Sequence, residues 1–115
     1  MHRHGYDESR APYRADILRL EDTLRASDIA VANAEASVKY LKTRLTHAHA
    51  HADVLYYECK YGITPMEEHP RALEEMENYL KDFEYALDLW EKAIRERSAT
   101  QKQLEAARSR LAEHR

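Results

Sequence analysis

The sequence predicts an all-α protein made of two long helices that form an antiparallel coiled-coil hairpin. Three observations support this prediction. Ala, Leu, Glu, Arg and Lys make up 61 of the 115 residues, a composition typical of long helices when it is periodic. Only 2 Gly and 3 Pro are available for the many turns that a sheet needs. Apolar residues recur in alternating steps of four and three, and we further expect two hairpins to pair into a four-helix bundle.

Composition and charge argue against several kinds of partner. The 18 basic and 21 acidic residues nearly balance, so the basic footprint of a nucleic-acid-binding protein is missing. No apolar run reaches the roughly 18 residues of a membrane span, so we expect no membrane partner. The first 14 residues lack the apolar stretch of a secretory signal, and we therefore expect an intracellular, cytoplasmic protein.

The chain is predicted to consist of a flexible tail, residues 1–9, and one helical-hairpin domain, residues 10–115. The first helix is expected over residues 10–61, because its apolar stripe runs through almost seven heptads without a skip. Only Ser27 interrupts the apolar character of this stripe. Its positions are Tyr13, Ile17, Leu20, Leu24, Ser27, Val31, Ala34, Val38, Leu41, Leu45, Ala48, Ala52, Leu55 and Cys59.

A turn is expected over residues 62–69. Gly62 follows the last periodic residue and suits the left-handed position just beyond a helix C-terminus, with Ile63 folding back on the last helical turn. Thr64 and Pro65 are typical of a helix start. Pro70 disfavours helical backbone at the residue before it, so we expect a short helical turn, a break, and the second helix over residues 70–113.

The second helix carries a stripe that is apolar at first and polar near its end. The stripe comprises Leu73, Met76, Leu80, Phe83, Leu87, Trp90, Ile94, Arg97, Gln101, Leu104, Arg108 and Leu111, with Ala107 as the alternative to Arg108. A short connection makes the two helices antiparallel. If the turn is symmetric about its middle, Ala52 faces Leu80 and Ala48 faces Phe83, so that small side chains meet large ones.

Apolar residues outside the two stripes are expected to form protein interfaces. The second helix has an extra stripe, Ala72, Tyr79, Ala86 and Ala93, with Tyr85 and Leu89 beside it, and the last turns of the first helix are rich in tyrosine. Exposed apolar stripes usually mark association, and Tyr and Met are enriched at interfaces. The alternatives are that the alanines are simply good helix formers and that the aromatic rings plug the end of the coiled coil. The predicted interface is Tyr56, Tyr57, Tyr61, Ile63, Met66, Tyr79, Tyr85 and Leu89.

Three alternating histidines offer a candidate metal site. His47 and His51 lie one helical turn apart and therefore on one face, a spacing that can chelate a transition metal, whereas His49 points elsewhere. With the facing assumed above, Glu84 would add a carboxylate. A set of three histidines is also able to titrate near neutral pH. The competing interpretation is a solvated flank of the coiled coil.

The sequence contains little that supports catalysis. It has no glycine-rich phosphate loop, and its one cysteine, Cys59, lies on the predicted apolar stripe, so we expect no catalytic residue, no cofactor and no enzymatic activity. The predicted function is a non-enzymatic coiled-coil scaffold that self-associates as a homodimer or joins a larger assembly as an adaptor. The alternative is a small metal- or pH-responsive regulator that uses His47, His49 and His51.

Overall fold

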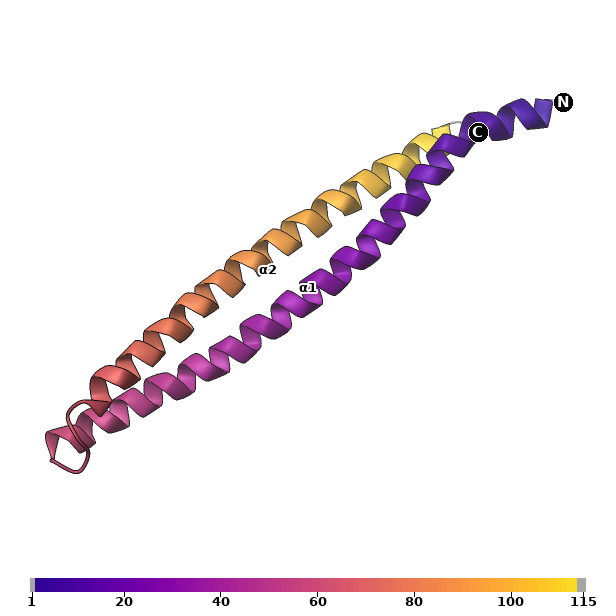
Figure 1. The fold of residues 1–115 in the computed structure, drawn as a ribbon. Coiled ribbons are helices and arrows are strands. Elements are labelled where there is room, and N and C mark those ends of the chain that lie inside the picture. The colour runs from indigo at the N-terminus through magenta and orange to yellow at the C-terminus, as the bar shows by residue number, and fades with distance from the viewer. Residues whose placement is uncertain (1, 114–115) are drawn as a thin grey trace. The chain divides into compact units, whose positions relative to one another are not determined.

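Two long helices account for nearly all of the structure, a computed structural model that describes residues 2–113 and the side chains of residues 10–113. Helix α1 spans His2–Lys60, helix α2 spans Glu68–Glu113, and residues 61–67 connect them (Figure 1). No strand occurs in residues 2–113, so the all-α helical hairpin is confirmed. Over those same residues neither helix is apolar enough to cross a membrane.

The helices begin earlier than the sequence predicts. Residues 2–9, predicted as a tail, belong to α1, because extending an existing helix adds a hydrogen bond for each residue ordered. Pro12 lies inside α1 without ending it. Helix α2 begins at Glu68, and Pro70 falls in its first turn, where a missing N–H leaves no bond unmade. Met1 of the predicted tail and residues 114–115 of the predicted domain lie outside the described residues.

The contacts divide the chain into two compact units rather than one. One unit comprises Met1–Ala32 and Lys92–Arg115, and the other is Asn33–Glu91, which contains the connection between the helices. In the first unit Leu20 packs with Leu104 and Ala107, supported by Ile17 and Leu24. In the second unit Ala52 and Leu55 pack with Ala72. Each unit therefore has a small core of its own, made by both helices.

The apolar stripe of α1 is confirmed at every predicted position. All fourteen residues of the stripe are buried or half-buried, and they include five of the most buried apolar side chains, Leu20, Val38, Ala48, Ala52 and Leu55. Ser27, the polar member, is half-buried as well. The unbroken heptad repeat therefore identifies the face of α1 that packs on α2.

The stripe of α2 is predicted correctly at seven of its twelve positions. The positions that are buried or half-buried as expected are Met76, Phe83, Leu87, Trp90, Gln101, Leu104 and Leu111. The residue before every second predicted position also faces inward, so that Ala72, Tyr79, Ala86, Ala93, Thr100 and Ala107 are buried or half-buried. Ala107, the predicted alternative to Arg108, is thus confirmed. The predicted Leu73, Leu80, Ile94, Arg97 and Arg108 are exposed. The extra stripe that the sequence assigned to an outer surface is therefore part of the seam between the helices.

The residues of α2 that lie opposite given residues of α1 also differ from the prediction, by about one heptad. Ala52 packs with Ala72 and not with Leu80, and Ala48 borders a hollow with Glu75 and Tyr79 and not with Phe83. The cause lies in the connection, which folds back along the end of α1. Consequently the ring centroid of His69, in the first turn of α2, lies 5.6 Å from the ring centroid of Tyr56, which is in the last turns of α1.

A pattern of backbone hydrogen bonds ends α1. Ile63 N–H donates to the carbonyl of Glu58 at 2.8 Å, and Gly62 N–H donates to that of Cys59 at 3.2 Å. This pair of bonds is the Schellman motif, which requires a left-handed residue, and Gly62 has a φ of 74°. The predicted role of Gly62 is therefore confirmed. Ile63, by contrast, is exposed and does not fold back under the last turn.

Replacing Leu104 with alanine should destabilise the unit that contains the N-terminal part of α1. Leu104 is 1% exposed, so its removal costs transfer free energy and leaves a cavity, in total about 2–4 kcal/mol of unfolding free energy. Leu18→Ala is the matched control, because Leu18 is 64% exposed and should change little. Thermal unfolding followed by circular dichroism measures both. Equal melting temperatures for the two variants would contradict the core described above.

Candidate functional site

The last turn of α1 and the connection that follows it present a cluster of exposed aromatic and apolar side chains, which we call the tip. Tyr57 and Tyr61 are 58% and 71% exposed, and Ile63 and Met66 are more exposed still. Tyr56 lies edge-on to Tyr57, with ring centroids 5.3 Å apart. All five of these predicted interface residues therefore come together at one end of the second unit, and their rings do not plug the seam between the helices.

Hydrogen bonds from side chains hold the tip in shape. The hydroxyl of Thr64 donates to the carboxylate of Glu58 at 2.7 Å, and the thiol of Cys59 donates to the carbonyl of Pro65 at 3.3 Å. Thr64 was expected to cap the second helix, and it instead ties the connection to the last turn of α1. Cys59 is half-buried, as its place on the apolar stripe predicts. The connection is thus a braced loop, and its side chains Tyr61, Ile63 and Met66 are exposed.

A groove of about 330 Å³ lies between the helices at the end of the second unit that is remote from the tip. Small side chains line it, with Ala34 of α1 and Ala86 of α2 at its floor and Ser37 of α1 at an exposed position on its side. Tyr85 and Leu89, both predicted interface residues, stand at its edge and are exposed. Asp82 also lines the groove, and no ion pair or hydrogen bond of its side chain is present in the described part of the chain. The groove therefore offers an apolar hollow with a carboxylate at its rim.

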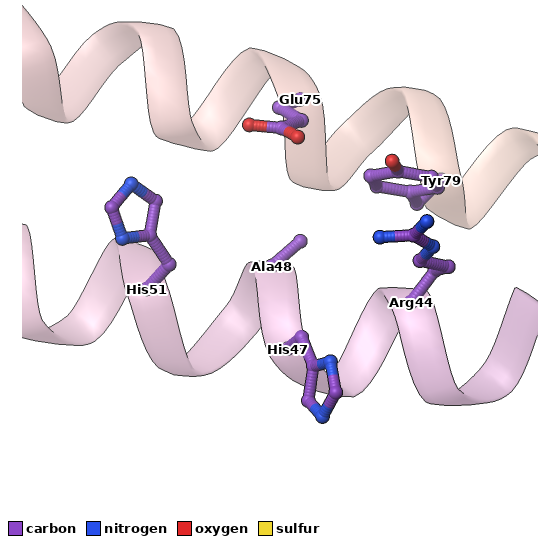
Figure 2. Close-up of a pocket in the computed structure, with 6 residues that line it drawn as sticks. All are labelled: Arg44, His47, Ala48, His51, Glu75 and Tyr79. Atoms are coloured by element: carbon purple, nitrogen blue, oxygen red, sulfur yellow. The ribbon is translucent and has the colours of Figure 1, made fainter.

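A smaller hollow of about 170 Å³ lies on the same side of the second unit (Figure 2). Arg44 dominates it. Its Nε–H donates to the hydroxyl of Tyr40 at 3.0 Å, and its guanidinium carbon lies 5.3 Å from the centre of that ring. The hydrogen bond to Tyr40, the charge interactions with Tyr40 and Tyr79, and the nearby Glu75 raise the pKa of Arg44. Arg44 is therefore a fixed positive charge beside the groove.

The three histidines do not converge on one point. In Figure 2 the ring of His51 lies on the side of α2, whereas the ring of His47 is directed away from α2. The acidic residue that borders this hollow is Glu75, and Glu84 is not part of it. His49 instead pairs with Asp53, with Nδ1 3.4 Å from the carboxylate. Among the described residues no three His, Cys, Asp or Glu side chains form a group that could hold a metal ion.

The eight predicted interface residues thus fall into three places. Tyr56, Tyr57, Tyr61, Ile63 and Met66 gather at the tip, Tyr85 and Leu89 border the groove, and Tyr79 is half-buried in the seam beside Arg44. Sequence reasoning missed Ser37, Arg44 and Asp82. Each of these three residues directly precedes a residue that faces inward. A heptad diagram with the correct inward positions of α2 would therefore have placed all three on the same side of the seam.

Comparison of the chain with protein-family models, curated proteins and solved structures finds no match. The functional argument therefore rests on the geometry of the tip and of the groove.

Removing the hydroxyl of Thr64 should loosen the tip. In Thr64→Val the carboxylate of Glu58 loses a half-buried donor, which should lower the free energy of unfolding by about 1 kcal/mol. Thr64→Ser keeps the hydroxyl and should retain most of that stability. Denaturant unfolding compares the two variants directly, and a Thr64→Val protein as stable as Thr64→Ser would show that this hydrogen bond does not brace the tip.

Proposed function

We propose that this chain is a non-enzymatic helical-hairpin scaffold that acts by packing against other protein surfaces. In this proposal the long helices self-associate, with two hairpins forming a four-helix bundle, and the tip docks onto a further protein of a larger assembly. The observation that carries the proposal is the amount of large apolar surface that the hairpin leaves uncovered. Exposed apolar patches of this kind usually mark association surfaces in soluble proteins.

The tip supports the docking part of the proposal. Tyr and Met side chains bury much area on binding, and a tyrosine also offers a polar hydroxyl, so both are enriched in interfaces. Tyr57 is exposed on the last turn of α1, and Tyr61 and Met66 are exposed on a loop whose backbone bonds to Glu58 and Cys59 fix its shape. A braced loop loses little conformational entropy when it binds, which favours affinity.

The exposed flanks of the seam support the self-association part. The inward positions of α2 hold Ala72 and Ala86, so larger neighbours such as Leu80 and Leu89 remain 41% and 44% exposed beside the seam. A two-helix hairpin has no third helix to cover them. Pairing of two hairpins into a bundle would remove the apolar surface of one such flank from water.

Self-association is tested by light scattering on a sizing column across a hundredfold range of concentration. The expected mass is about twice the 13.5 kDa of one chain over most of that range, because burial of the flanking apolar residues favours the dimer. A mass of one chain throughout would reject self-association and leave docking through the tip as the remaining mode of action.

Docking through the tip is tested with the double variant Tyr57→Ala and Tyr61→Ala. Both side chains are largely exposed, so helicity and melting temperature should not change, whereas recovery of bound proteins from the native cell should fall. Leu18→Ala is the control, because it removes an equally exposed apolar side chain from the other unit. Identical sets of proteins bound to wild type and to the double variant would reject the tip as a docking site.

A further inference from the structure

The groove and the hollow beside Arg44 lie on one side of the second unit, which we call the groove face. Ala34, Leu41 and Ala48 follow one another at intervals of seven residues, and the groove and the hollow share this row of α1. Tyr79 and Ala86 are likewise seven residues apart on α2. Side chains at such intervals occupy the same face of a coiled coil, so the groove and the hollow form one continuous surface.

The two helices carry opposite charge on the groove face. Helix α1 contributes the positive charge of Arg44, and α2 contributes the carboxylates of Glu75 and Asp82. Figure 2 shows Arg44 on α1 and Glu75 on α2 at the two edges of the hollow. A surface with a positive half and a negative half is complementary to a rotated copy of itself, because each half then meets its opposite.

We propose that the occupant of the groove face is a second copy of this chain, related to the first by a twofold axis parallel to the helices. The inference rests on the proposed function and specifies the surface and the partner for its self-association. With this axis α1 of one copy lies over α2 of the other at the same level. Arg44, which lies level with Tyr79 of its own chain, then approaches Asp82 of the second copy, one helical turn along from its Tyr79.

The charges also select this axis over the other twofold arrangement of two stacked hairpins. An axis perpendicular to the helices would lay α1 over α1 and α2 over α2. Arg44 would then face the positive half of the second copy, and Glu75 and Asp82 would face its negative half. Like charges placed opposite each other disfavour such a complex, whereas the parallel axis forms each favourable pair twice.

The shape of the groove face supplies both parts of a self-complementary contact. Tyr85 is 65% exposed and projects from the rim, while Ala34 and Ser37 leave room in the groove. In the twofold arrangement Tyr85 and Leu89 of each copy lie over the α1 segment that contains Ser37 in the other copy. An interface of this symmetry needs the projecting side chain and its hollow on the same surface, and the groove face has both.

A charge-reversal experiment tests the pairing. Arg44→Glu and Asp82→Lys each place like charges opposite each other twice in the dimer, so each variant alone should dimerise about tenfold more weakly at low salt. An equimolar mixture of the two variants should recover the mass of a dimer, because every opposed pair in the mixed dimer is again of opposite sign. Lys42→Glu is the matched control, since Lys42 is exposed on the other flank of α1 and should leave dimerisation unchanged.

A second pair of variants tests the shape of the face without altering the core. Ser37→Arg fills the groove from an exposed position and should abolish the dimer while circular dichroism stays unchanged. Leu80→Lys alters the opposite flank of α2 and should leave the dimer intact. If the dimer is lost in Leu80→Lys but survives Ser37→Arg and both charge reversals, the groove face is not the dimer interface, although the protein does self-associate. If the wild-type protein stays monomeric, both the groove-face dimer and self-association are rejected, whereas docking through the tip is not affected.

Discussion

Everything in this structure follows from the constraint that each helix has only one neighbour within the chain. A helix with one neighbour can bury one stripe, and here that stripe is narrow, since among the described large apolar side chains few besides Leu20, Leu55 and Leu104 are buried. The cores of the two units are correspondingly small, with Leu20, Leu104 and Ala107 in one and Ala52, Leu55 and Ala72 in the other. Apolar residues beside the stripe therefore stay exposed, and they constitute the surface from which the proposed function is argued.

The small residues on the inward face of α2 connect the packing to the candidate surfaces. Alanine at positions such as Ala72 and Ala86 allows two helix backbones to approach closely. The small side chain of Ala86 also leaves space in the groove that it lines. The larger neighbours, Leu80 and Leu89 among them, are displaced to the two flanks. The same choice of residues thus closes the hairpin and creates the apolar surface outside it, so stability within the chain and association between chains are linked.

The sequence predicts the elements of this fold better than their mutual arrangement. The heptads of α1 and the left-handed Gly62 are evident because single residue types carry those signals. On α2 adjacent residues such as Ala72 and Leu73 are both apolar, and periodicity alone cannot decide which one faces inward. The heptad offset depends on the bonds of Thr64 and Cys59 across the turn, which no repeat reveals. Glu84 was consequently placed near His47, and the groove beside Asp82 was missed.

Charge in this molecule is better understood as selecting arrangements than as stabilising them. In the first unit Arg97 on α2 pairs with Asp28 on α1, and Arg108 approaches Glu21 at 3.9 Å, all with partly exposed side chains. Exposed pairs of this kind contribute about 1 kcal/mol or less each, so the apolar core must hold the unit together. A shifted alignment of the helices would nevertheless leave these charges unmatched. The opposed charges on the groove face act by the same principle between two chains, where they distinguish one twofold arrangement from the other.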